Sequence, residues 1–178
     1  AYLEEGKAIT IEDLLEFLLI YSANDAAYVA AMASTGSIES FVVEMNNKTD
    51  SLGMKNTTFL NPDGLDQLGH TTTLRDLLAM SLKFIENNRL MSIASKKSFS
   101  SDITGIEKIY YSTNEIIDEG FIGIKTGWTS GAGLTFIGLN LDNGRQILTL
   151  VNKSIVDNKK ITHFEDTQLL YQNSYKYF

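Results

Sequence analysis

The sequence predicts a chain of the mixed helix-and-strand class (α/β, in its α+β form), with helices in the first half and antiparallel strands in the second. Apolar residues recur at helical spacing up to about residue 95. After residue 95 the pattern becomes strand-like, and Asp142-Asn143-Gly144 supplies a hairpin turn between two apolar segments. The 178 residues, 43% of them hydrophobic, are enough for one packed domain.

The first half predicts four helices and one long loop. Thr10 caps a helix that runs to about residue 19, and a second helix is expected over residues 25–33, stopping at Gly36. Ser37 caps a third helix, and Thr72 or Thr73 caps a fourth. Residues 53–72 are rich in turn formers and include the only proline, so we expect an ordered loop there.

The second half predicts five strands and a last helix. The strands are expected at 98–103, 108–113, 120–125, 133–141 and 145–152, and the helix at 159–176. The apolar segment 147–151 is far shorter than the roughly 20 residues of a membrane span. We therefore expect no span within the sequence.

Composition excludes several classes of function. A net charge of -7 argues against sequence-independent nucleic-acid binding, which needs a basic surface. Without cysteine the chain has no disulfide, thiol nucleophile or thiolate metal site. His70 and His163 are far apart and belong to no His-Glu-x-x-His pattern, so neither a zinc site nor a histidine triad is expected. Any chemistry must use Ser, Thr, Lys or carboxylates.

Two short motifs carry candidate chemistry, and each has a plain structural alternative. Lys125-Thr126-Gly127 ends an apolar strand, where it is either a solvated strand end or a cation and hydroxyl presented to a carboxylate. Gly127 would let a ligand approach the backbone. Ser22-Ala23-Asn24 lies between two helices, where it either caps a helix or places a hydroxyl beside an amide in a cleft.

In this order the two motifs resemble the second and third elements of the Ser-x-x-Lys, Ser-x-Asn, Lys-Thr-Gly signature of β-lactamases and penicillin-binding proteins. The wider resemblance is to the serine-type D-alanyl-D-alanine carboxypeptidase family. It extends over Asp25-Ala26-Ala27, Phe41-Val42, Met45-Asn46, residues 52–57 and 61–66, His70, Asp76-Leu77, residues 123–127 and Leu169-Leu170.

The resemblance implies a transpeptidase-like fold, with an antiparallel sheet packed between helices. Residues 1–178 would form a single incomplete domain, helical with the Ser-x-Asn loop over about 1–95, and with sheet, Lys-Thr-Gly strand and last helix over about 96–178. It also implies an extracytoplasmic protein that binds peptidoglycan stem peptides, is inhibited by β-lactam antibiotics, and needs no cofactor or metal.

The resemblance further assigns roles to seven residues. Lys125 would attract the substrate carboxylate, and Thr126, Thr129 and the open backbone at Gly127 would help to bind it. Ser22 would pass a proton to the leaving amine. Asn24 would hold the acyl amide, and the backbone N–H of Trp128 would form part of the oxyanion hole.

Three departures from the family pattern stand out. No lysine has a serine three residues before it, so the sequence contains no Ser-x-x-Lys and hence no family nucleophile. Trp128 replaces an imidazole common in the family, and Thr162 and His163 lie where relatives often place an arginine. No signal-peptide pattern begins at Ala1. Whether a membrane anchor follows Phe178 is open.

Three explanations of the absent serine follow: truncation, a separate N-terminal segment carrying Ser-x-x-Lys, or a degenerate homologue that only binds peptidoglycan. We favour the first two, because Ser22, Asn24, Lys125 and Thr126 are present. The expected activity of the intact protein is removal of terminal D-alanine, while this chain alone is expected to be inactive. A β-lactamase is a further alternative, although residues 53–72 contain no glutamate of the kind used for deacylation.

Overall fold

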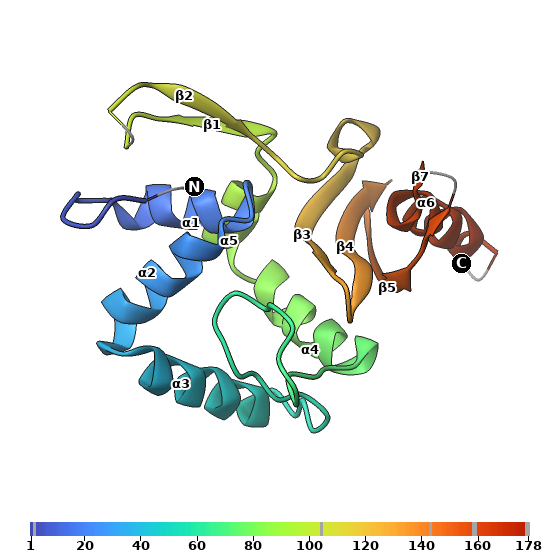
Figure 1. Cartoon of the computed structure of the whole chain (residues 1–178). Coiled ribbons are helices and arrows are strands. Elements are labelled where there is room, and N and C mark those ends of the chain that lie inside the picture. The colour runs from blue at the N-terminus through green and yellow to red at the C-terminus, as the bar shows by residue number, and fades with distance from the viewer. Residues whose placement is uncertain (2, 104, 143, 158–159, 177–178) are drawn as a thin grey trace. The chain divides into compact units, whose positions relative to one another are not determined.

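The structure is a computed structural model that describes residues 1, 3–103, 105–142, 144–157 and 160–176 (Figure 1). It divides the chain into two compact units, Ala1–Thr113 and Asn114–Phe178. Each unit has its own buried cluster, around Phe17 in the first and Phe136 in the second. That the two units form a single domain stays a prediction.

The N-terminal unit contains five helices and one hairpin among its described residues. They are α1 (Ile11–Leu19), α2 (Asn24–Thr35), α3 (Ile38–Ser51), α4 (Leu74–Ile85), α5 (Asn88–Ala94), β1 (Ser98–Ser101) and β2 (Lys108–Tyr111). The predicted caps Thr10, Ser37 and Thr73 are confirmed, since each side chain accepts a backbone N–H of the first helical turn. The short helix α5, capped by Asn87, was not predicted.

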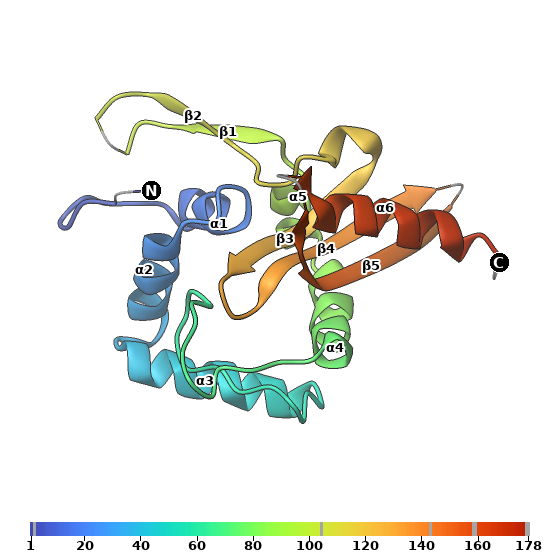
Figure 2. The ribbon, with the colours of Figure 1, turned by 45° about the vertical axis from the view of Figure 1, so that its right-hand side comes forward.

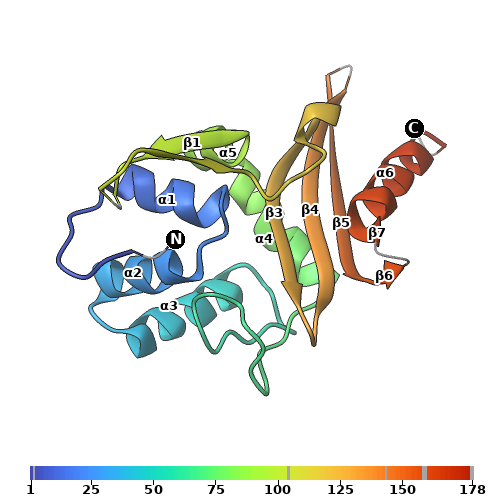
Figure 3. The same ribbon diagram turned by 45° about the horizontal axis from the view of Figure 1, so that its top comes forward.

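The core of this unit joins α1 to the hairpin. Phe17 of α1 is fully buried and meets the rings of Phe99 and Tyr110 edge-on, at centroid distances of 4.9 and 4.8 Å. The hairpin accordingly runs alongside α1 in each view (Figures 1–3). Both strands end two residues earlier than predicted, at Ser101 and Tyr111.

The loop between α3 and α4 contains no helix or strand, as predicted, but it is tied at several points (Figure 3). A bridge between Thr58 and Thr71 closes it. The buried carboxylate of Asp76 accepts the N–H of Asn56 and the hydroxyl of Thr57, both at 2.8 Å. The side chain of Asn46 bonds both backbone groups of Phe59. The prediction that this loop is ordered in solution would be tested by slow exchange of its amide hydrogens.

The C-terminal unit is a three-stranded antiparallel sheet with one long helix. Its elements are η1 (Ile117–Glu119), β3 (Phe121–Thr129), β4 (Gly133–Asp142), β5 (Arg145–Ser154), β6 (Val156–Asp157), β7 (Lys160–Ile161) and α6 (Thr162–Ser174), and the sheet order is β3-β4-β5 (Figure 3). Asp142 pairs with Arg145, which confirms the predicted hairpin, although Asn143 lies outside the described residues.

Two predicted boundaries of this unit were wrong by more than two residues. The strand expected at 120–125 runs from Phe121 to Thr129, because β4 continues to pair with it beyond Lys125. The helix expected from residue 159 begins at Thr162, because Lys160 and Ile161 pair with β6, while residue 159 lies outside the described residues.

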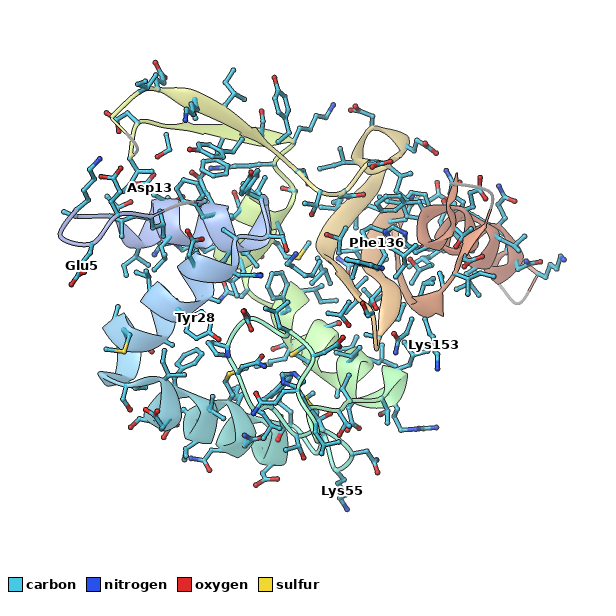
Figure 4. All side chains as sticks on the ribbon, in the orientation of Figure 1. Glu5, Asp13, Tyr28, Lys55, Phe136 and Lys153 are labelled. Carbon is cyan, nitrogen blue, oxygen red and sulfur yellow. The ribbon has the colours of Figure 1, made fainter. Side chains whose placement is uncertain are left out.

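The helix α6 covers one face of the sheet, along β4 and β5 (Figure 2). Phe136, labelled in Figure 4, is fully buried and meets Phe164 of α6 edge-on at 5.1 Å. Cross-strand partners share a face, and Phe136 is paired with Thr126, whereas the next residue, Ile137, is paired with Lys125. Lys125 therefore belongs to the face opposite α6.

No single helix among the described residues is long and apolar enough to cross a membrane. The bent pair α2 and α3, with 88° between the two helices, reaches that length and composition only when both are taken together.

Candidate active site

Ser22 occupies a strained turn between α1 and α2. Its φ of +62° lies in the left-handed region, which costs a residue with a side chain roughly 1–2 kcal/mol. Two main-chain bonds of 3.0 Å or less close the turn, from the Ala23 N–H to the Phe17 carbonyl at 2.9 Å and from the Ile20 N–H to the Glu16 carbonyl at 3.0 Å. Strain of this kind is found at functional sites more than elsewhere.

The capping alternative does not account for Ser22 or Asn24. The N-cap of α2 is Ala23, and no side chain caps this helix end. Asn24 is the first residue of α2 and is exposed, and no hydrogen bond of its side chain is found among the described residues. The amide of Asn24 is thus available beside the Ser22 turn.

Lys125 follows an irregularity in β3 at the edge of the sheet. The register shifts between Gly123 and Lys125, leaving Ile124 as an extra residue, and such bulges redirect side chains. The Lys125 Nζ donates to the Thr126 carbonyl at 2.9 Å. Burial of the Lys125 side chain, most of which is shielded from water, lowers its pKa from 10.5 to about 8. Its ammonium is therefore poorly hydrated, which strengthens any pairing with an anion.

The residues after Lys125 complete the end of β3. A Cβ added at Gly127 would meet nothing nearer than the Thr135 Cβ, at 3.9 Å, so packing does not demand glycine there. The Trp128 side chain is 66% exposed. The Thr129 hydroxyl oxygen accepts the Ala132 N–H at 3.0 Å and so also serves the β3–β4 turn.

The structure thus gathers the predicted residues in two sets. Ser22 and Asn24 lie together in the N-terminal unit, and Lys125, Thr126, Gly127, Trp128 and Thr129 lie together in the C-terminal unit. That the two sets line one cleft stays a prediction, as do their roles.

A large cavity lies elsewhere, within the N-terminal unit. It measures about 800 Å3 between α3, α4 and α5, and none of the seven predicted site residues lines it. Its apolar lining includes Met45, Leu52, Met54, Met80, Phe84 and Leu90. Among the described residues no cluster of His, Asp or Glu suited to a metal ion occurs.

Solved structures define the class of fold. The chain is similar to a D-alanyl-D-alanine carboxypeptidase from Mycobacterium tuberculosis, with a TM-score of 0.88 and 27% identity over 97% of this chain and 67% of that one. It is also similar to penicillin-binding protein D2 from Listeria monocytogenes in its cefotaxime-bound form, with a TM-score of 0.78 and 30% identity over 97% and 73% of the two chains. The predicted penicillin-binding, transpeptidase-like fold is confirmed.

The D-alanyl-D-alanine carboxypeptidase family model, peptidase S11, matches residues 1–154. The chain is 33% identical to DacF of Bacillus subtilis, over 74% of this chain and 34% of DacF, and 28% identical to DacC of Escherichia coli, over 99% and 44%. The chain therefore belongs to the D-alanyl-D-alanine carboxypeptidase family. It spans between a third and a half of the length of these two relatives.

Proposed function

We propose that this chain is the part of a D-alanyl-D-alanine carboxypeptidase that binds the substrate and transfers a proton. The intact protein would remove the terminal D-alanine from peptidoglycan pentapeptide stems. The observation that carries the proposal is Lys125, a poorly hydrated cation on edge strand β3. Gly127, two residues later on the same strand, is not required by packing.

Each residue has one role in the proposed reaction. Lys125 and the hydroxyls of Thr126 and Thr129 bind the terminal carboxylate of the substrate. Asn24 holds the amide of the acyl part, and the backbone N–H of Trp128 donates to the oxygen that gains charge. Gly127 leaves the backbone open at this edge.

The covalent step requires a serine that these 178 residues do not supply. The hydroxyl oxygen of a Ser-x-x-Lys serine adds to the carbonyl carbon of the last peptide bond, its proton passes to the lysine of the same segment, and the C–N bond of that peptide breaks. Ser22 passes a proton to the departing D-alanine amine. Water then hydrolyses the ester, which restores the serine and frees the shortened stem peptide.

The place and the inhibitors of the reaction follow from the substrate. Peptidoglycan lies outside the cytoplasmic membrane, so the proposed site of action is extracytoplasmic, at the cell wall. β-Lactams are the proposed inhibitors, and structures of the Listeria relative in cefotaxime- and ampicillin-bound forms support this.

Labelling with a fluorescent penicillin tests the proposal. The 178-residue chain alone should stay unlabelled, and a polypeptide that carries a Ser-x-x-Lys segment ahead of Ala1 should be labelled stably and should release D-alanine from a pentapeptide. Replacing the serine of that segment by alanine is the control. Rapid loss of the label would indicate a β-lactamase, and no labelling of the longer polypeptide would indicate a homologue that only binds peptidoglycan.

A further inference from the structure

Something outside the turn must hold Ser22 in its left-handed conformation. Isolated, the turn would relax toward negative φ, because only its surroundings offset the steric cost of the side chain. The two main-chain bonds that close the turn belong to α1 and its immediate continuation. Further support comes from the β1–β2 hairpin, about 90 residues later in the sequence.

The hairpin and the residues just after it contact the two residues that precede Ser22. The N–H of Thr113, just after β2, donates to the carbonyl of Ile20 at 3.1 Å. The ring of Tyr110 meets the ring of Tyr21 edge-on at 5.1 Å. Tyr21 is thus held by β2, and Ile20 by Thr113, two residues after the end of β2.

Tyr110 also reaches the other end of the turn. It meets Phe17 edge-on at 4.8 Å, and Phe17 is the residue whose carbonyl receives the Ala23 N–H. Phe99 of β1 stacks on Tyr110 at 5.2 Å, and the Tyr110 side chain is buried. The ring of Tyr110 therefore contacts Tyr21, just before Ser22, and Phe17, whose carbonyl accepts the N–H of Ala23, just after Ser22.

We propose that Tyr110 is a positioning residue, whose ring holds the α1–α2 turn so that the Ser22 hydroxyl stays where the proposed proton transfer needs it. The inference rests on the proposed function of Ser22. It assigns to the β1–β2 hairpin a part in the reaction, through the turn that it braces. Neither Tyr110 nor Thr113 stands out in the sequence, because a contact across 90 residues leaves no local pattern.

The test uses a polypeptide that carries the Ser-x-x-Lys segment. Tyr110→Leu keeps an apolar side chain but loses the ring, and we expect its first-order acylation rate constant for penicillin to fall at least tenfold while the dissociation constant for reversible penicillin binding changes less than threefold. Tyr110→Phe restores the ring and should restore the rate. Phe99→Leu is the matched control, because it thins the same cluster, while the ring contacts of Phe99 among the described residues are with Phe17 and Tyr110 and not with Tyr21. It should lower thermal stability and leave the rate within threefold.

A double-mutant cycle shows whether Tyr110 acts through Ser22. In a Ser22→Ala background, Tyr110→Leu should slow acylation no further. Amide exchange at Ala23 should also rise in Tyr110→Leu and not in Phe99→Leu. A wild-type polypeptide that is not acylated would overturn the proposed function. If the wild type is acylated normally, either of two results would overturn the positioning role alone. One is that Tyr110→Leu and Phe99→Leu slow acylation equally. The other is that Tyr110→Leu slows acylation as much in the Ser22→Ala background as in the wild type.

Discussion

The two segments that carry the proposed site are built in opposite ways. The Ser22 turn is irregular, and its φ of +62° persists because α1 and the β1–β2 hairpin hold it. The Lys125–Thr129 segment is a regular strand end, paired with β4 from Lys125 to Thr129. Its departure from regularity is the bulge just before Lys125.

The two segments differ in which unfavourable free-energy term each one contains. At the turn the cost is backbone strain, which long-range contacts must offset. At the strand the backbone is relaxed, and the cost is the burial of a cation, visible as the lowered pKa of Lys125. Ser22→Gly in the turn should therefore raise stability while it lowers activity, whereas Gly127→Ala in the strand end should lower activity alone.

The largest expected effect is at Ser22. Ser22→Gly and Ser22→Ala both remove the hydroxyl, so each should slow acylation of a Ser-x-x-Lys-bearing polypeptide by about 100-fold or more. Glycine alone also relieves the strain, so Ser22→Gly should be more stable than Ser22→Ala by about 1 kcal/mol. Urea unfolding of the two variants measures the difference. Equal stabilities would show that the turn is not strained.

Lys125 should give the next largest effect. Lys125→Ala removes a charge-assisted bond of about 1.5–3 kcal/mol to a bound carboxylate, which corresponds to a roughly 10- to 100-fold loss in acylation efficiency by penicillin. Its thermal stability should not fall below that of the wild type, because the substitution also removes a buried cation. Normal acylation of a folded Lys125→Ala variant would remove Lys125 from the site.

The lowered pKa of Lys125 should make two quantities depend on pH in opposite directions: ligand binding, which weakens as the pH rises, and stability, which increases. As pH rises through about 8, folded Lys125 loses its proton, so reversible binding of a carboxylate-bearing β-lactam should weaken. Between about 8 and 10.5 the unfolded chain binds more protons at this residue, so its contribution to stability should rise with pH. Lys125→Arg keeps its charge in this range and should show neither change.

The sequence predicted the strand that leads to Lys125, but neither its continuation to Thr129 nor the strain of the Ser22 turn, for a physical reason. A Lys-Thr-Gly triplet after apolar residues places a strand locally, and three helix caps were equally local. The strain at Ser22 and its brace at Tyr110 depend on contacts between distant residues, which periodicity cannot express. The start of α6 was missed likewise, since the pairing of β6 with β7 is tertiary information.

Alanine substitutions at Gly138 and Gly127 should distinguish a glycine needed for packing in the sheet from one needed for ligand binding. A Cβ at Gly138 would lie 2.6 Å from the Phe136 Cε1, inside a fully buried cluster, so Gly138→Ala should cost about 1–3 kcal/mol of stability. Gly127→Ala should stay within about 0.5 kcal/mol of the wild type, since its Cβ has room. Only at Gly127 should acylation slow in a fully folded protein. Normal acylation of Gly127→Ala would show that no ligand approaches this edge closely.

The smallest expected effect is at His163 in the C-terminal unit, where burial of the imidazole ring is unfavourable. The His163 ring is buried against Phe164, at a centroid distance of 4.0 Å, and its Nδ1 has no hydrogen-bond partner among the described residues.

Burial lowers the pKa of His163 below 6.5, and the nearby Asp166 offsets part of that shift. As pH falls below 6.5 the unfolded chain therefore takes up a proton that folded His163 does not, and stability should fall. His163→Leu removes both the unpaired nitrogen and the titration, so the stability of this variant relative to the wild type should rise as the pH is lowered from 7.5 to 5.5. The pKa of His70 is lowered as well, so the measured quantity is the difference between wild type and His163→Leu in urea unfolding at each pH, in which the contribution of His70 cancels. A difference that stays constant over this pH range would mean that His163 is protonated as readily in the folded protein as in the unfolded chain.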